Sequence, residues 1–302
     1  MGDLNTHVEF DFYGADGNES VSNSHGFRLR HAYGTLGNLL AGQTWTNFMN
    51  PASLPDTVDF GGPVGQIFDR QAQVRWTQPF GGPGSATSGQ WSVGLENPET
   101  VVADSRRREL SRRRRPSARR HRPGAVQYVD RQDLRPRPVR QIRVDSASAP
   151  AVVDQKLGGA VSVAGVIPAV GKDDFRFTAS AGNAIGRYSN GFFPDGVVGS
   201  DGQIRLPKQW GWFAAYRHYW FDQLRSNLVL STAGENNPAG APASTNKSTR
   251  SAHVNLIWSP VANSDLGLEY IHADRETEDG LKGHLSRLQA SAKVRVLERP
   301  AH

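Results

Sequence analysis

The stretch SRLQASAKVRV, Ser286–Val296, alternates apolar and polar residues without a break. Leu, Ala and Val occupy its even positions from 288 to 296, and Arg, Gln, Ser and Lys occupy its odd positions. Because successive side chains of a strand point to opposite faces, this period of two predicts a β-strand with one apolar and one polar face. The same pattern recurs in HVEFDFYG, GFRLRHAYG, DDFRFTASAG and WGWFAAYRHYWF. We find no convincing amphipathic helix, so the sequence predicts an all-β chain.

The connections between the predicted strands alternate between tight turns and long polar loops. This rhythm is typical of an up-and-down outer-membrane β-barrel, whose antiparallel strands need about 9–11 residues to cross the membrane. A large soluble β-sandwich or barrel is the alternative. The polar faces argue against it, because Arg, Gln, Ser and Glu on nearly every strand suit a water-filled lumen. We predict strands at 6–14, 26–34, 38–46, 67–78, 89–97, 139–146, 156–167, 173–185, 208–221, 224–234, 249–259, 264–273 and 284–296.

The formal charge of +6 on the 302 residues is concentrated in one segment. Residues 105–138 hold 13 of the 35 Lys and Arg but three of the 29 Asp and Glu, so the remainder carries 22 basic and 26 acidic residues. The basic balance therefore gives no whole-protein argument for binding nucleic acid. The chain has no cysteine, which excludes disulfides and thiolate zinc sites.

No run of about 18 apolar residues predicts a transmembrane helix. The start, MGDLNTHVEF, has neither the basic region nor the apolar run of a signal peptide. If the protein is exported, we expect its true beginning to lie upstream of this chain.

No catalytic constellation stands out. The nine histidines show no metal-ligand spacing, and the Gly-rich stretches GGPVG and GGPGSATSG lack the Lys-Ser/Thr of a phosphate-binding loop. A carbohydrate-active enzyme would need paired carboxylates in a cleft, and no such pair is evident. His272, Asp274 and Glu276 could form a metal site in a loop, but a solvated external loop is the simpler interpretation. We therefore predict no enzymatic activity, no cofactor and no metal site.

The block RLRHAYGTLGNLLAGQTWTNFMNPASLPDTVDFGGPVGQIFDRQAQVRWTQP, Arg28–Pro79, resembles the signature region of the DcaP-like outer-membrane porins. VGLENPET from Val93, VRQIRVD from Val139, GNAIGRY from Gly182 and GLEYIHADRE from Gly267 resemble the same family in the same order. The resemblance covers most of residues 3–104 and 139–296.

The resemblance implies a 16-stranded trimeric barrel in a Gram-negative outer membrane, passing small anionic solutes, dicarboxylates among them. It also implies a signal peptide and two further strands before VEFDFYG. We count thirteen strands and expect a fourteenth between Asn97 and Val139, so about two N-terminal strands are missing. We thus predict a single, N-terminally incomplete barrel domain over residues 1–302, acting as an outer-membrane porin for passive or weakly specific uptake. It could also be a truncated or defective copy.

Basic residues on the polar faces are the predicted functional groups. Rings of Arg in a pore favour anions, and Arg binds carboxylates with two nitrogens at once. The alternative is that several of them pair with wall carboxylates such as Glu9, Asp11, Asp69 or Glu269 and only stiffen the wall. By strand parity the predicted pore-lining residues are Arg28, Arg30, Arg75, Arg143, Arg176, Arg217, Arg287 and Arg295.

On the register that the resemblance gives, TNFMNPASLPDTVDFGGPVGQ, Thr46–Gln66, is the third external loop. In porins generally this loop folds into the lumen and narrows it. Asp56 and Asp59 are therefore candidates to face basic wall residues across a constriction. An ordinary external loop is the alternative.

The arginine-rich segment 105–138 has three interpretations. It could be a basic arm that binds nucleic acid or anionic lipid headgroups, a disordered external loop, or a stretch translated out of frame. We favour the third, because its Arg codons can be chosen so that a shifted frame encodes an Asp-rich loop and a barrel strand. We then expect the segment to be disordered and to supply no strand. A nucleic-acid-binding β protein remains the alternative function, although it rests on this segment alone and we regard nucleic acid as an unlikely partner.

Overall fold

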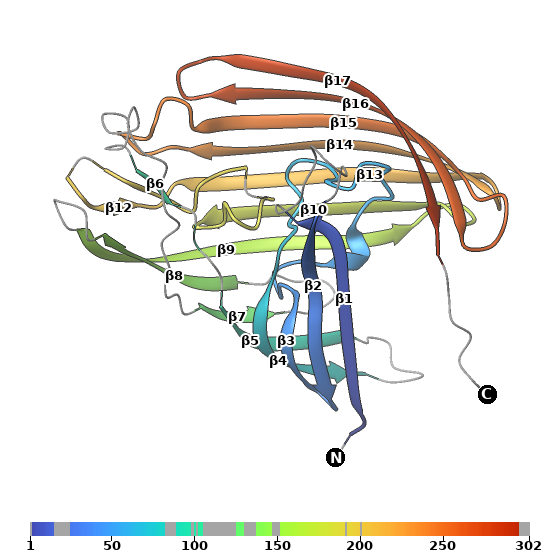
Figure 1. Ribbon diagram of the computed structural model, residues 1–302, viewed down its shortest axis with the longest axis horizontal. Coiled ribbons are helices and arrows are strands. Elements are labelled where there is room, and N and C mark those ends of the chain that lie inside the picture. The colour runs from blue at the N-terminus through green and yellow to red at the C-terminus, as the bar shows by residue number, and fades with distance from the viewer. Residues whose placement is uncertain are drawn as a thin grey trace.

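The computed structural model describes residues 2–14, 25–81, 89–97, 100, 102–104, 125–129, 137–146, 152–190, 192–199 and 201–295. Within them the chain forms one antiparallel sheet of 14 strands, each paired with its neighbours in sheet order (Figure 1). The strands are β1 Leu4–Gly14, β2 Gly26–Leu36, β3 Leu39–Trp45, β4 Arg70–Phe80, β5 Gly89–Glu96, β7 Ala125–Val129, β8 Arg137–Ser146, β9 Val152–Pro168, β10 Asp174–Asn183, β13 Lys208–Phe221, β14 Leu224–Asn236, β15 Asn246–Trp258, β16 Ser264–Thr277 and β17 Lys282–Val294.

A second, three-stranded sheet is formed by segments of two connections, one between β5 and β7 and the other between β10 and β13. It consists of β6 Val102–Asp104, β11 Gly196–Val198 and β12 Ile204–Arg205, with β11 parallel to β6. The one helical turn among the described residues is η1, a 3-10 turn at Pro51–Ser53. No helix in the described ranges is long and apolar enough to cross a membrane.

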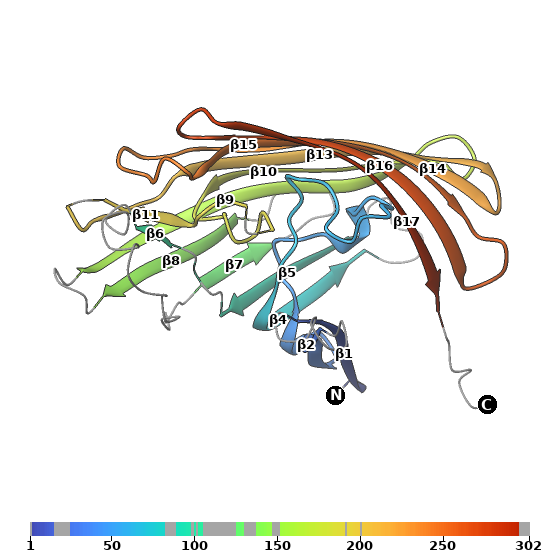
Figure 2. The same ribbon diagram turned by 45° about the horizontal axis from the view of Figure 1, so that its top comes forward.

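The large sheet curls strongly but stays open in the structure (Figure 2). Its order begins at β1 and ends at β17, and the described pairings join these two strands only to β2 and β16. The all-β prediction and the thirteen strands predicted by residue range are confirmed. The two terminal strands of the sheet therefore present unpaired backbone edges within the described residues.

The segment 105–138 departs from the prediction at two places, because Arg137 and Pro138 begin β8 and a second stretch forms a strand of its own. Ala125–Val129 forms β7, which pairs with β5 on one side and β8 on the other, so the expectation of no strand is wrong for these five residues. AVQYV has strand-favouring Val and Tyr, and it lies between two strands whose backbone groups need partners. At five residues, β7 is shorter than the about 9–11 residues of a membrane strand. Residues 105–124 and 130–136 lie outside the described part of the chain.

The sheet is polar inside and apolar outside, the reverse of a soluble protein. Strand β15 shows this clearly, because its residues alternate between buried and exposed from Thr249 to Trp258. Its buried polar side chains are Thr249, Ser251, His253 and Asn255. Its exposed apolar side chains are Val254, Leu256 and Trp258. An exposed apolar face that extends over so many strands matches the lipid-facing surface of a membrane barrel.

Loop lengths alternate along the sheet as predicted. The turns 37–38, 222–223 and 259–263 are short, whereas 46–69, 184–207 and 237–245 are long and lie at the other end of the strands. One predicted loop is wrong: strands β16 and β17 extend into 274–283 and leave a turn of only four residues, 278–281. Cross-strand pairs such as Arg275↔Gly283 continue the ladder there, so the polar sequence did not end the strands.

The apolar core lies on the concave side of the sheet, between two of the long loops. Phe48, Met49 and Ile67 from loop 46–69 pack with Ile185 and Tyr188 from loop 184–207. Phe68 donates its backbone N–H to the Tyr188 carbonyl at 2.9 Å, which ties the two loops together. The inside of the curled sheet is thus filled at this level by loops rather than by strand side chains.

Candidate functional site

Loop 46–69, which joins β3 to β4 and is called the inward loop below, lies against the inner face of the sheet (Figure 2). It contacts strands that are more than 100 residues away in sequence, through pairs such as Ser53 with Thr178 and Val64 with Ser251. The prediction of a loop folded onto the inner wall therefore agrees with these contacts. We call β10 and β13–β16, which are among the strands that it touches, the anchored wall.

Glu269 of β16 is the main anchor of the inward loop. Its side chain is fully buried and accepts hydrogen bonds from the backbone N–H groups of Val58 and Asp59, both at 2.9 Å. Asn255 donates to the same carboxylate at 2.9 Å, and the ring of His253 lies 3.4 Å from it. Because a buried carboxylate needs such donors, the wall and the loop satisfy each other's polar groups.

A glycine lets the loop backbone approach the wall closely. Gly65 has a φ of +78°, and a Cβ there would come within 2.5 Å of the Thr232 carbonyl oxygen and 2.7 Å of the Trp212 carbonyl oxygen. Gly211 of β13 faces the same point, because a Cβ at Gly211 would lie 2.9 Å from the Gly65 Cα. Two facing glycines thus remove the side chains that would hold the loop away from the wall.

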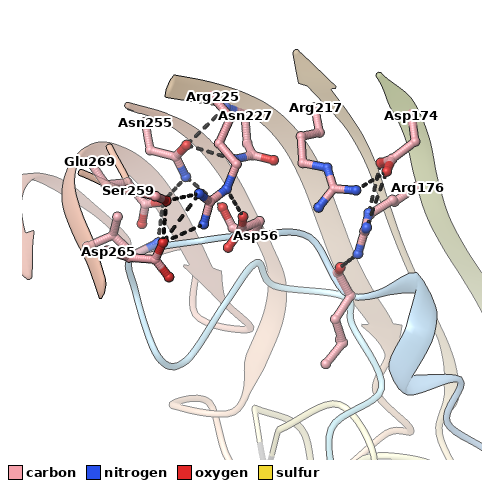
Figure 3. A network of polar contacts seen from close by, with 12 residues as sticks. Asp56, Asp174, Arg176, Arg217, Arg225, Asn227, Asn255, Ser259, Asp265 and Glu269 are labelled. Atoms are coloured by element: carbon pink, nitrogen blue, oxygen red, sulfur yellow. Dashed lines mark hydrogen bonds and ion pairs between the residues drawn. The ribbon is translucent and has the colours of Figure 1, made fainter. Parts of the chain in front are cut away.

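Both acidic residues predicted for the loop form ion pairs with arginines of the wall. Asp56 binds Arg225 of β14 at 2.6 Å, and Asp59 binds Arg287 of β17 at 2.9 Å. Arg225 also reaches Asp265 at 3.4 Å and donates to Ser259 at 2.8 Å (Figure 3). The aspartates therefore contact their basic partners directly rather than across an open gap.

A second pair of arginines lies beside this contact. Arg176 of β10 and Arg217 of β13 share the carboxylate of Asp174, and Arg176 also donates to the loop carbonyl of Leu54 at 2.7 Å (Figure 3). The Nε of Arg217 has no hydrogen-bond partner among the described residues. Arg176 is thus fully occupied in positioning the loop, whereas Arg217 retains donor capacity.

These groups border a cavity of about 450 Å³, called the arginine cavity below. Arg295, which follows β17, completes its basic side and reaches Asp265 at 3.6 Å, with more than half of its side chain exposed. Four arginines and two carboxylates line this volume, and Asp174 pairs with two of the arginines from outside the lining. The site therefore has a surplus of positive charge that favours a small anion. The lining residues are Leu54, Pro55, Asp56, Arg176, Arg217, Tyr219, Arg225, Asp265 and Arg295.

The other predicted pore-lining residues lie elsewhere. Arg28 and Arg30 contact Asp11 near the edge of the sheet, and Arg30 also pairs with Glu9, so the alternative of wall-stiffening ion pairs applies to them. Arg75 lies on β4, and its Nε has no partner among the described residues. Arg143 lies on β8, but its side chain is outside the described part of the structure.

The sequence analysis missed several residues of the site. Arg225 lies between Leu224 and Ser226 on a predicted strand. The alternation of side chains between the two faces of the strand could therefore have placed it on the polar face. The pairing of Asp174 with two arginines and the role of Glu269 as the loop anchor gave no local signal. Glu269 finds its partners in Val58 and Asp59, and Arg176 finds the carbonyl of Leu54, all more than 100 residues away in sequence.

The candidate metal residues were expected in a loop, but the structure places them on β16. Asp274 pairs with Arg250 at 2.7 Å, and Glu276 pairs with Lys247 at 3.0 Å. His272 lies 3.7 Å from Asp274. Among the residues that the structure describes, no group of three or more His, Asp or Glu is arranged to hold a metal ion.

Comparison with known proteins places this geometry in context. The model of the DcaP outer membrane protein family matches residues 1–80 and 211–295. The outer membrane channel DcaP of Acinetobacter baumannii has a similar fold, with a TM-score of 0.75 and 24% identity over 97% of this chain and 81% of that one. OmpT of Vibrio cholerae gives a TM-score of 0.44 and 11% identity over 88% and 77% of the two chains. No curated protein sequence matches the chain.

Proposed function

Because the chain belongs to the DcaP outer membrane protein family, we propose that it acts as an outer-membrane channel, not an enzyme, for small anionic solutes such as dicarboxylates. Uptake would be passive or weakly specific. The observation that carries this proposal is the arginine cavity, which four arginines and two carboxylates line beside the inward loop. Basic residues in a pore lower the barrier for a passing anion, and several weak contacts let it leave again.

The two cavity arginines with the fewest protein contacts are the best candidates for contacting the solute. Arg217 pairs with Asp174 and lies over the Tyr219 ring at 5.3 Å, and Arg295 makes one long ion pair with Asp265. Arg176 and Arg225 hold loop atoms, so we assign them to positioning the inward loop. This division predicts that selectivity and loop position can be altered separately.

The test is the reversal potential of the refolded protein in a planar bilayer under a KCl gradient. We expect a preference for chloride over potassium that Arg217→Gln with Arg295→Gln reduces about 30-fold, since each of the two removed charges contributes about 1 kcal/mol to an ion passing at about 4 Å in water. Arg205→Gln is the control, because Arg205 pairs with Asp201 on an exposed loop outside the cavity. A cation preference in the wild type, or the same ratio in the double variant, would contradict the proposal.

We further propose that the working form is a 16-stranded barrel, completed by about two strands at its N-terminal edge, and that it is a homotrimer. The open edges at β1 and β17 support the need for additional strands, because an unpaired backbone group in lipid costs several kcal/mol. The mass of the detergent-extracted protein, measured by light scattering, tests the trimer. A monomeric mass would contradict it.

A further inference from the structure

The outward face of β14–β17 changes abruptly from apolar to charged near the long-loop end. Two rows of residues run across these strands there: Arg250↔Asp274↔His284 and Ser248↔Glu276↔Lys282. We call them the outer polar rows. They lie on the same face as Val254 and Leu256, because even positions of β15 point outward.

The rows toward the other end of the same strands are almost wholly apolar. Successive rows are Val254↔Tyr270↔Leu288, Leu256↔Leu268↔Ala290 and Trp258↔Leu266↔Ala292. Their large side chains are exposed, as expected for the lipid-facing band of a membrane barrel. Only the row Ala252↔His272↔Ser286 separates the outer polar rows from this band.

The position of the outer polar rows along the strands determines which part of the membrane they contact. They lie next to the end of the strands where the long loops 184–207 and 237–245 lie, and long loops of outer-membrane barrels face the cell exterior. Immediately beyond the apolar band, an outward side chain meets lipid headgroups rather than acyl chains. The outer polar rows therefore lie at headgroup level in the outer leaflet.

Their side chains line a cavity of about 390 Å³, to which Arg275 from the register position between the two rows also contributes. With Arg275, the cations Arg250 and Lys282 outnumber the two carboxylates of Asp274 and Glu276, and His284 lies beside them. Arg250 gives its Nε to Asp274 at 2.7 Å, yet its side chain is 74% exposed. Lys282 is 73% exposed and lies 3.7 Å from Glu276. Both cations are thus oriented by a carboxylate and still accessible to a ligand.

We propose that the outer polar rows bind the phosphorylated headgroup of an outer-leaflet lipid. Guanidinium and ammonium groups are the usual protein ligands of phosphate, and Arg binds it with two parallel hydrogen bonds. The acyl chains of the same lipid would lie over Val254, Tyr270 and Leu288. Asp274 and Glu276 act as positioning residues that hold Arg250 and Lys282 in the plane of the sheet.

The location on the lipid face separates this site from the arginine cavity. The outer polar rows and the cavity occupy opposite faces of the sheet, since β15 places Arg250 outward and Asn255 inward. The inference therefore does not depend on anion transport, and either could fail without the other.

The test is native mass spectrometry of the refolded protein in detergent with bisphosphorylated lipid A, and with the same lipid after removal of both phosphates. We expect the phosphorylated form to be retained and the dephosphorylated form to be lost. Arg250→Gln with Lys282→Gln should weaken binding about 30-fold, because each cation near a lipid surface contributes about 1 kcal/mol. The matched control is Lys172→Gln with Arg205→Gln, which removes two carboxylate-paired cations elsewhere.

Three outcomes would overturn the proposal. They are equal retention of both lipids, unchanged binding in the Arg250/Lys282 variant, and equal loss in the control pair. The proposal would also be overturned if inorganic phosphate alone bound the site as tightly as lipid A does. The acyl chains would then contribute nothing to binding. Heat-dependent migration on gels reports whether each variant folds. Arg250→Lys keeps the charge and should therefore retain lipid binding.

Discussion

The anchored wall and the two edges of the sheet differ in how their inward faces are covered. On the wall, every second side chain of β13 from Gln209 to Ala215 is buried, and the inward loop occupies the concave side. On β1 and β17, most residues are exposed on both faces. Arg287, which binds Asp59, is the contact that links the β17 edge to the loop. The inner face is thus buried along the wall that the inward loop covers, whereas the two edge strands remain mostly exposed.

The largest expected effect concerns the edges. Fusing two amphipathic strands with barrel alternation ahead of Leu4 should bridge the edges of β1 and β17 and close the sheet. Each backbone group left unpaired in lipid costs several kcal/mol, so closure should be close to all-or-none. Heat-dependent gel migration after refolding into detergent measures it. The same fusion carrying proline at alternate strand positions is the control and should not close. Closure of the unfused chain would contradict the need for further strands.

The second effect concerns the anchor of the loop. Glu269→Ala leaves the Val58 and Asp59 N–H groups and Asn255 without their buried acceptor, which should cost about 2–5 kcal/mol. We expect the inward loop to detach from the wall and become cleavable by protease between residues 46 and 69. Glu269→Gln keeps one acceptor oxygen and should give a smaller effect. A loop that stays protected in the alanine variant would show that Glu269 is not its anchor.

A smaller effect is expected at the ion pair between Asp56 and Arg225. Asp56→Asn keeps the shape but removes one carboxylate from the arginine cavity, so the surplus of positive charge grows. Because Arg225 also binds Asp265 and Ser259, the loss of stability should stay near 1 kcal/mol. Reversal potentials should shift further toward anions, with Asp201→Asn on an exposed loop as the control. A shift toward cations would contradict this assignment.

Much of the fold and part of the site followed from sequence. Period-two alternation placed the strands, and parity put Arg176 and Arg217 on the inner face. Sequence could not show that Arg176 holds the Leu54 carbonyl or that Glu269 caps two loop N–H groups, because such contacts depend on how far the sheet curls. Nor could it show that loop 184–207 packs on Phe48, since a polar loop with a few apolar residues gives no partner.

The smallest effect concerns the turn between β9 and β10. Hydrogen bonds from the Tyr216 hydroxyl, the Tyr219 backbone N–H and His218 lower the pKa of Asp173 from 3.8 to about 2. A lowered pKa means that this carboxylate stabilises the fold above pH 3.8, and the contribution is lost as pH falls toward 2. Asp173→Asn should therefore have a lower free energy of unfolding in urea than the wild type at pH 7. The difference between the two free energies should shrink as pH falls toward 2. A constant difference across this range would contradict the assignment.

The inward loop and the anchored wall should unfold as one unit, while the edges of the sheet, whose outer backbone groups lack strand partners among the described residues, should open separately. Hydrogen exchange of the detergent-solubilised chain, read by mass spectrometry, tests it most directly. We predict slow exchange for β13–β16 together with residues 53–66, and fast exchange for β1 and for the outer half of the β17 amides, which have no strand beyond them. Equal protection of β1 and β14, or fast exchange throughout the inward loop, would contradict the account.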